Sequence, residues 1–209
     1  MDKHLSKTVA ALAAALVLAA CSQAPAPAPQ KTEAETKKPP EPTGPVAARN
    51  AFFEMYKPAR TWATDLLPLS LTAGEIPGMT NADGKAAMWT VVFVSPSRRE
   101  ARTFTWAAAD HADIHKGISV GGAQPWSGVT AKSRPFQITE FSVDSDDAYK
   151  TAAVKAAAWI KAHPGKPVSM TLANNPRFPA PVWYVLWGTP KNGYLAFVNA
   201  STGTIETGK

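Results

Sequence analysis

VWYVLWGTPKNGYLAFVNASTGTIETGK, residues 182–209, places two runs rich in aromatic and β-branched residues on either side of a turn. Such residues favour strands, and Asn192-Gly193 is typical of a hairpin turn. The stretch therefore predicts strands at 181–188 and 193–199. In the first run, Trp183, Val185 and Trp187 alternate with Val182, Tyr184 and Leu186, so both faces are apolar. A strand with a helix on one face should alternate apolar with polar residues, so this one needs cover on both faces.

A helix and a strand are predicted immediately before this hairpin. Asp144 or Ser145 can cap the helix, because their side chains accept backbone N–H groups. An apolar stripe from Tyr149 to Ile160 follows the helical period, and Pro164-Gly165 ends it. A strand at 167–173 completes a unit of one helix and three antiparallel strands.

The same pattern occurs earlier in the chain. Leu69–Thr72 resembles Val168–Thr171, and Trp89–Pro96 resembles Trp183–Pro190 with equal spacing. Phe104 follows the first tryptophan by 15 residues and Phe197 follows the second by 14. Repetition in the same order predicts two tandem α+β units, at 47–135 and 136–209.

The first unit is less regular than the second. A stripe from Ala48 to Trp62 predicts a helix, but Pro58 lies inside it and predicts a kink or break near Lys57. Strands are expected at 67–74, 87–95 and 101–107. Glycine and proline make 108–135 a connecting segment with a short strand at Ile118–Val120, and another strand is expected at Phe136–Val143.

The N-terminus is typical of an exported protein. Lys3 and Lys7 precede an apolar run of 12 residues, Val9–Ala20, which is too short to span a membrane but suits a secretory signal. Leu18-Ala-Ala-Cys21 resembles the bacterial lipobox, in which cleavage leaves a lipid-modified cysteine. Because Cys21 is the only cysteine, the chain can form no internal disulfide. We expect residues 1–20 to be removed and Cys21 to anchor the protein in the lipid bilayer.

A tether is expected to follow the anchor. Seven of the 25 residues from 22 to 46 are proline and few are apolar, so we expect 21–46 to be a disordered, extended segment. Ser22 permits transport to the outer membrane, and we expect a periplasm-facing location there. The net charge of +6 comes from scattered bases, and the expected compartment excludes a nucleic-acid partner.

Residues 142–207 resemble the PepSY domain family of bacterial envelope proteins. The likeness rests on a helix followed by a short antiparallel sheet, and on a closing turn with Ala200, Thr202, Gly203 and Ile205 at matching positions. Asn199 replaces the usual aspartate, and the first unit lacks the motif. The resemblance implies a cystatin-like α+β fold and a binding or regulatory module, with peptidases as one kind of partner. It transfers no catalytic residue and no cofactor.

The most concentrated polar cluster is Asp110–His115. His111, Asp113 and His115 could offer metal ligands, but the remaining ligands of a zinc hydrolase are not evident, and a polar loop is the simpler interpretation. The leading hypothesis is a non-enzymatic envelope module that binds a protein or peptide at an exposed sheet edge or groove. The alternatives are a metal-dependent hydrolase using these three residues, and a purely structural envelope component.

Trp183, Tyr184 and Trp187 are the candidate partner surface. We expect the sister unit, rather than a partner, to cover the second face of their strand, since intramolecular packing is the usual fate of apolar side chains.

Overall fold

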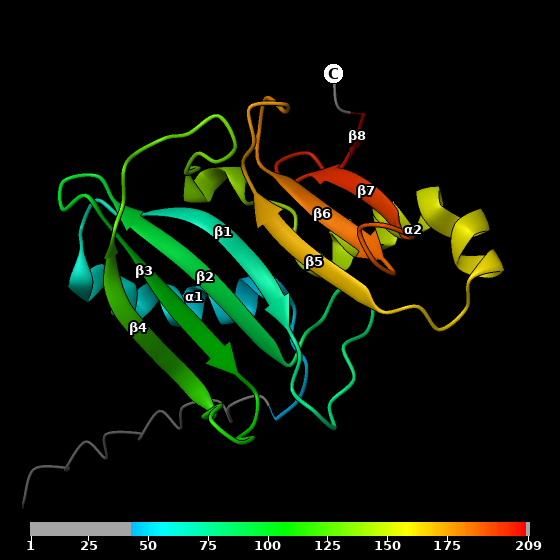
Figure 1. Ribbon diagram of the computed structural model, residues 1–209, viewed down its shortest axis with the longest axis horizontal. Helices are drawn as coiled ribbons and strands as arrows, with labels where there is room; N and C mark the ends of the chain where they lie inside the picture. Colours follow the sequence, from blue (N-terminus) through cyan, green and yellow to red (C-terminus); the bar gives the residue numbers. More distant parts are fainter. Residues whose placement is uncertain (1–42, 208–209) are drawn as a thin grey trace, which may run out of the picture. The chain divides into compact units, whose positions relative to one another are not determined.

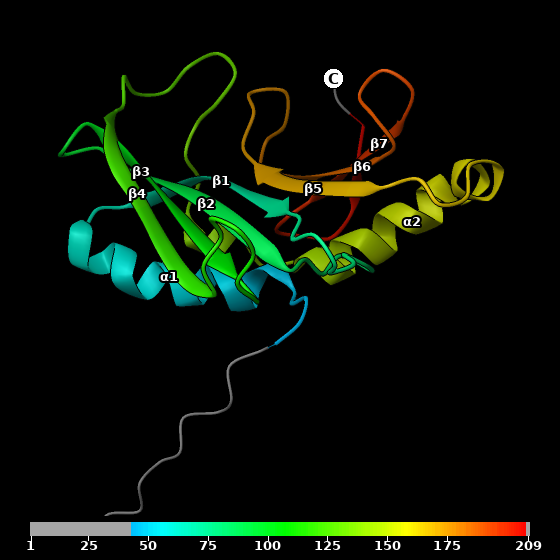
Figure 2. The ribbon, with the colours of Figure 1, turned by 60° about the horizontal axis from the view of Figure 1, so that its bottom comes forward.

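The computed structural model describes residues 43–207, which fold as one eight-stranded antiparallel sheet with two helices on the same face (Figures 1 and 2). The predicted α+β class is confirmed. The strand order is β4-β3-β2-β1-β5-β6-β7-β8. The N-terminal half is α1 (Ala48–Trp62), β1 (Leu67–Gly74), β2 (Met88–Ser95), β3 (Glu100–Ala107) and β4 (Gly117–Pro125). The C-terminal half is a 3₁₀ turn (Ile138–Glu140), α2 (Ser145–Ala162), β5 (Val168–Ala173), β6 (Val182–Trp187), β7 (Tyr194–Asn199) and β8 (Ile205–Glu206).

The two halves join edge to edge. In each half the first strand after the helix lies at the centre of the sheet and the later strands follow outward. The central strands β1 and β5 pair through three residue pairs, with Leu71 opposite Leu172 in the middle. One continuous sheet and one core cluster therefore extend across both halves.

The core lies between the helices and the sheet, and two tryptophans meet at its centre. Trp89 on β2 and Trp183 on β6 are fully buried, with ring centroids 6.1 Å apart. The indole N–H of Trp89 donates to the carbonyl of Val46 at 2.9 Å, and that of Trp183 donates to the carbonyl of Val143 at 2.9 Å. Each acceptor lies two residues before a helix, so each tryptophan fixes the entry of its own helix onto the sheet.

The N-termini of the two helices also meet, and the residues that cap α2 serve α1 as well. Asp144 is the N-cap of α2, and its Oδ1 accepts from the N–H of Ser145 at 2.7 Å and of Arg49 at 2.9 Å. The buried Oγ of Ser145 accepts from the N–H of Ala48 at 2.8 Å. Because the N-cap of α1 is Ala47, which has no capping side chain, α1 depends on residues nearly a hundred positions later for its first hydrogen bonds.

Several sequence expectations need correction. Helix α1 continues through Pro58 to Trp62 without a break, because its buried stripe holds it against the sheet. The connecting segment contains a nine-residue strand, β4, where only three residues were expected. No strand forms at 136–143, where the 3₁₀ turn instead leads into α2. Val46, placed at the end of the tether, is buried and pairs with Ala86.

The predicted signal segment 1–20, Cys21 and the tether as far as residue 42 lie outside the described residues. Among residues 43–207, neither helix is both long enough and apolar enough to cross a bilayer.

Asp65, in the connection between α1 and β1, makes the stability of the fold depend on acidity. The Oγ of Ser95 donates to its carboxylate at 2.6 Å and the N–H of Ser97 at 2.8 Å, and in that order these bonds lower its pKa from 3.8 to about 2. Because the pKa of Asp65 is lower in the folded state than in the unfolded state, its ionised carboxylate stabilises the fold at pH values above the unfolded-state pKa. This stabilisation is lost as the pH falls towards the folded-state pKa.

We therefore expect wild type to exceed Asp65→Asn in thermal stability at pH 5, and the difference to shrink between about pH 4 and pH 2. Melting curves across that range, with Asp113→Asn as the control for loss of one exposed carboxylate, measure it. A constant difference would show that the carboxylate charge is not what the two serines stabilise.

Candidate functional site: the open face of the sheet

The predicted histidine cluster lies on an exposed turn. His111, Asp113 and His115 belong to the connection between β3 and β4, where His111 forms an isolated bridge with Ile114. All three side chains are exposed, and the nearest ionic contact joins His115 Nδ1 to Asp110 Oδ1 at 3.9 Å. Across residues 43–207, no three His, Cys, Asp or Glu side chains come together as metal ligands. The turn thus has the geometry of a solvated hairpin connection.

The aromatic residues proposed as a partner surface divide between the two faces of the sheet. Trp183 and Trp187 are 0% and 2% exposed and face the helices, where Trp187 packs against Tyr149 of α2. These two are core residues rather than an open surface. Tyr184 lies on the opposite face and is half-buried.

The second face of β6 is covered by its own neighbours. Phe178, from the loop between β5 and β6, lies 4.9 Å from Phe197 on β7 and 6.5 Å from Tyr184, measured between ring centroids. The guanidinium of Arg134 holds this loop by donating to the carbonyl of Phe178 at 3.0 Å. The expectation that the sister unit covers this face is wrong, because that half extends the sheet sideways instead of stacking on it.

Away from that aromatic cluster, the face opposite the helices carries hydroxyl groups in one continuous row. Side chains alternate between faces along a strand, and directly paired residues share a face. The strand registers therefore align a set of side chains across the open face, which we call the hydroxyl row. Its members, in sheet order from β4 to β5, are Ser119, Thr105, Thr90, Thr72 and Thr171.

The row continues onto aromatic residues and is connected by hydrogen bonds. Thr171 pairs with Tyr184, and Tyr184 pairs with Phe197. The hydroxyls of Thr90 and Thr105 are 3.2 Å apart, and Thr171 donates to Thr72 at 3.4 Å. Thr72, the middle one of these seven side chains, is exposed.

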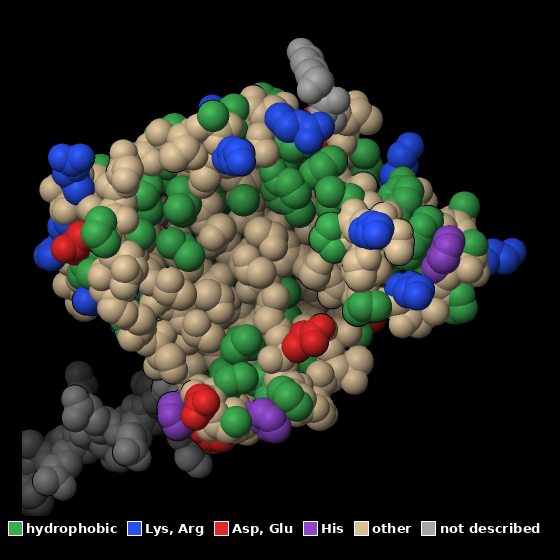
Figure 3. Space-filling model, viewed as in Figure 1, with side chains coloured by type: hydrophobic (Ala, Val, Ile, Leu, Met, Phe, Trp, Pro, Cys, Tyr) green, Lys and Arg blue, Asp and Glu red, His purple; other side chains and the backbone are tan. Residues whose placement is uncertain are grey.

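The open face has little charge. Figure 3 shows this side of the molecule, with Lys, Arg, Asp and Glu around the sheet and hydrophobic or uncharged groups over its middle. Burial raises the pKa of Tyr184, so its phenol stays neutral at physiological pH. Glu206 shares this face only at the β8 edge, where Asn199 Nδ2 donates to its carboxylate at 2.8 Å.

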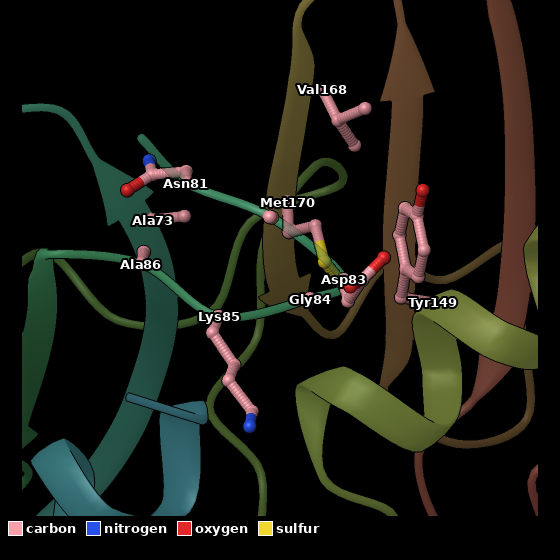
Figure 4. Close-up of a pocket in the computed structure, with 10 residues that line it drawn as sticks. Ala73, Asn81, Asp83, Gly84, Lys85, Ala86, Tyr149, Val168 and Met170 are labelled. Atoms are coloured by element: carbon pink, nitrogen blue, oxygen red, sulfur yellow. The ribbon is translucent and has the colours of Figure 1, made fainter. Parts of the chain in front are cut away.

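A small cavity lies near the point where β1 and β5 separate. It has a volume of about 190 Å³ and lies between Tyr149 of α2, Met170 of β5 and the turn Asn81–Ala86 (Figure 4). Ligand pockets usually exceed about 300 Å³, so this space suits a few water molecules or one inserted side chain.

The open face suits binding better than chemistry. Threonine hydroxyls are weak nucleophiles unless a base activates them, and their neighbours in the row are other hydroxyls, a phenol and a phenyl ring. They can donate and accept hydrogen bonds while their methyl groups make apolar contacts. The sequence contained this signal as alternating threonines in β1, β2, β3 and β5, but the row appears only once the strand order and registers are known.

Comparisons with known proteins leave the family open. No family model matches the chain, so membership of the PepSY family stays a prediction. No curated protein matches it. One solved structure is similar, that of a Clostridium difficile 630 protein described as a candidate lipoprotein. It is 10% identical, with 76% of this chain and 91% of that chain covered and a TM-score of 0.48.

Proposed function

We propose that this protein is a membrane-tethered envelope lipoprotein whose open sheet face binds another envelope protein without catalysis. The observation that carries the proposal is the contrast between the two faces. Both helices pack on one face and bury most of it, whereas the other presents a row of uncharged hydroxyl side chains from β4 to β5, continued by the half-buried Tyr184 and Phe197.

The size and chemistry of this face set the kind of partner. Together with Tyr184 and Phe197 at its end, the row crosses seven strands, which at about 4.8 Å spacing span roughly 29 Å. A stable interface needs about 800 Å² on each partner, which a face of that width can supply. Because charged groups are costly to bury without a counter-charge, the complementary surface should be uncharged and rich in hydrogen-bonding groups.

The anchor and its location remain part of the proposal and rest on the sequence alone. Leu18-Ala-Ala-Cys21 supports lipidation of Cys21, and Ser22 supports an outer-membrane position facing the periplasm. The proline-rich tether would let the folded part reach a partner away from the membrane.

We further infer that the chain holds two tandem PepSY-like units, of which 136–209 is the clearer. The strand registers support this inference: Leu71 is opposite Val91 as Met170 is opposite Val185, two residues after the matched tryptophans. The inference is also supported by the equivalent hydrogen bonds that the indoles of Trp89 and Trp183 donate to the residues before α1 and α2. If the family resemblance extends to function, the partner is a peptidase that the module restrains.

The test is site-specific photo-crosslinking in cells that make the full chain. A photoreactive residue replaces Thr72, at the centre of the open face, and in a matched chain it replaces Val154, which is 80% exposed on α2. We expect an adduct with an envelope protein from position 72 and none from position 154. A further change, Thr171→Lys, should abolish that adduct because it places a charge within the row, next to Thr72.

Equal adducts from both positions, or none from position 72, would contradict the proposal. If the captured protein is a peptidase, its activity should fall when the purified full chain is added. Unchanged peptidase activity would remove the inhibitory role and leave the binding role in place.

A further inference from the structure

Strand β4 (Gly117–Pro125) is an open edge of the sheet. It pairs with β3 on one side, and among residues 43–207 no strand pairs with its other side. Eight of its nine residues are exposed. At about 3.3 Å per residue, the edge presents roughly 30 Å of backbone with unpaired N–H and C=O groups.

This edge lacks most of the devices that keep sheet edges apart. Natural edges are usually short, charged or covered, and the opposite edge, β8, is only two residues long. Residues 117–125 include no charged side chain. Ile118 and Val120 are 38% and 49% exposed, although they lie on the same face as the buried Phe104 and Trp106. Its protective features are a bulge near Gly121, where the pairing with β3 shifts register, and Pro125, which ends the strand.

We propose that β4 pairs in antiparallel fashion with β4 of a second copy of this chain, joining two sheets into one of sixteen strands. A two-fold axis near Gly121 would place each strand against its own reverse and each bulge against its counterpart. Self-pairing usually brings like charges together, but an uncharged strand carries no such cost. The pairing would also shield the exposed side chains of Ile118 and Val120.

This interface would hold the dimer only weakly in dilute solution, but it would be strong enough to form dimers on a membrane. A single pair of edge strands buries less than the standard interface of about 1,600 Å². Two copies anchored in one bilayer would meet at a much higher effective concentration. The pairing does not depend on the proposed binding face, because contact at β4 leaves that face free, but its strength at the membrane rests on the proposed lipid anchor.

Cysteine crosslinking of the full chain under mild oxidation tests the proposal. Gly121→Cys places two thiols opposite each other at the axis, and a chain that carries both Ser119→Cys and Ala123→Cys places facing thiols on either side of it. Val154→Cys is the control on exposed α2, which also accounts for any contribution from Cys21. A Cβ at Gly121 meets only the carbonyl oxygen and Cβ of Thr103, at 3.4 and 3.6 Å, so the fold tolerates it. We expect disulfide-linked dimers from edge positions well above those from position 154 and from wild type.

A charge at the edge gives the second readout. Val120→Lys should raise the dissociation constant of the dimer at least about tenfold in sedimentation velocity of the full chain in detergent, because two lysines would meet across the axis. Val154→Lys is the matched control and should leave the dimer unchanged, and circular dichroism checks that both variants fold. A monomer at every concentration up to about 1 mM would overturn the proposal. So would edge cysteines that crosslink only to a different protein, which would assign β4 to a foreign strand.

Discussion

Replacing Trp183 with alanine should destabilise the protein by about 3–5 kcal/mol, as large-to-small changes of buried aromatic residues do. The side chain is fully buried, and its ring packs against Trp89 at 6.1 Å and Phe141 at 5.8 Å. Its indole N–H also satisfies the carbonyl of Val143. The variant therefore leaves a cavity at the centre of the core and an acceptor without its partner at the entry to α2. Because domains of this size are stable by only about 5–15 kcal/mol, the loss is a large part of the total.

Urea unfolding monitored by circular dichroism measures the change. Trp183→Phe separates its two causes, because a phenyl ring restores much of the packing but cannot donate to Val143, so we expect an intermediate loss. Trp126→Ala is the matched control, since Trp126 is partly exposed in the segment after β4 and should cost less than about 1 kcal/mol. Similar losses from positions 183 and 126 would mean that Trp183 does not anchor the core.

Most strands of this fold could be predicted well because their signals are local, the exceptions being β4 and the segment 136–143. The expected strands at 67–74, 101–107 and 193–199 agree with β1, β3 and β7 to within one residue at each end. The start of α2 was predicted from Asp144 and Ser145, and its end from Pro164-Gly165. Both could be predicted because capping and helix termination depend on residues beside the helix. Pro58 misled because the apolar face of α1, which is a tertiary feature, outweighs the local cost of one lost hydrogen bond.

Sheet assembly could not be predicted, because it depends on pairing between distant strands. The apolar second face of β6 could be buried by the other half, by a partner protein or by a nearby loop. The sequence does not show that Phe178, in the loop between β5 and β6, folds back onto this face. The supposed equivalence of Phe104 and Phe197 fails for a related reason. Phe104 is opposite Val91, whereas Phe197 is opposite Tyr184, so the one-residue difference in spacing puts them on opposite faces.

The candidate site depended on the same missing information. Single threonines in four strands are ordinary strand residues, and only the register makes Thr72 pair with both Thr90 and Thr171. The aromatic residues attracted attention in the sequence because they are large, yet Trp183 is buried against Trp89 of the other half and Trp187 against Tyr149 of its own half. For a sheet covered on one side, therefore, surface function is better sought at small polar positions than at the most hydrophobic strand.

The second large effect is expected from Gly84→Ala, at a turn where the backbone approaches α2. Gly84 has a φ of +78°, and a Cβ added there would lie 2.4 Å from the carbonyl oxygen of Ser145 and 2.6 Å from Cα of Asp146. A left-handed conformation costs a residue with a side chain about 1–2 kcal/mol. The contacts add to this, because both atoms belong to the backbone at the start of α2 and cannot rotate away. Moving them would disturb the N-terminus that also supplies hydrogen bonds to α1.

Gly78→Ala separates the cost of the left-handed conformation from the cost of the contacts with α2. Gly78 has a φ of +85°, but a Cβ there meets no atom within 4 Å, so this variant measures the conformational cost alone. We expect Gly78→Ala to lose about 1–2 kcal/mol and Gly84→Ala to lose at least about 3 kcal/mol in the same unfolding experiment. The difference between them is the free energy of the close approach between the turn and the helix. If the two losses are equal, α2 can move without cost, and the junction where the two helices meet is less rigid than its hydrogen bonds imply.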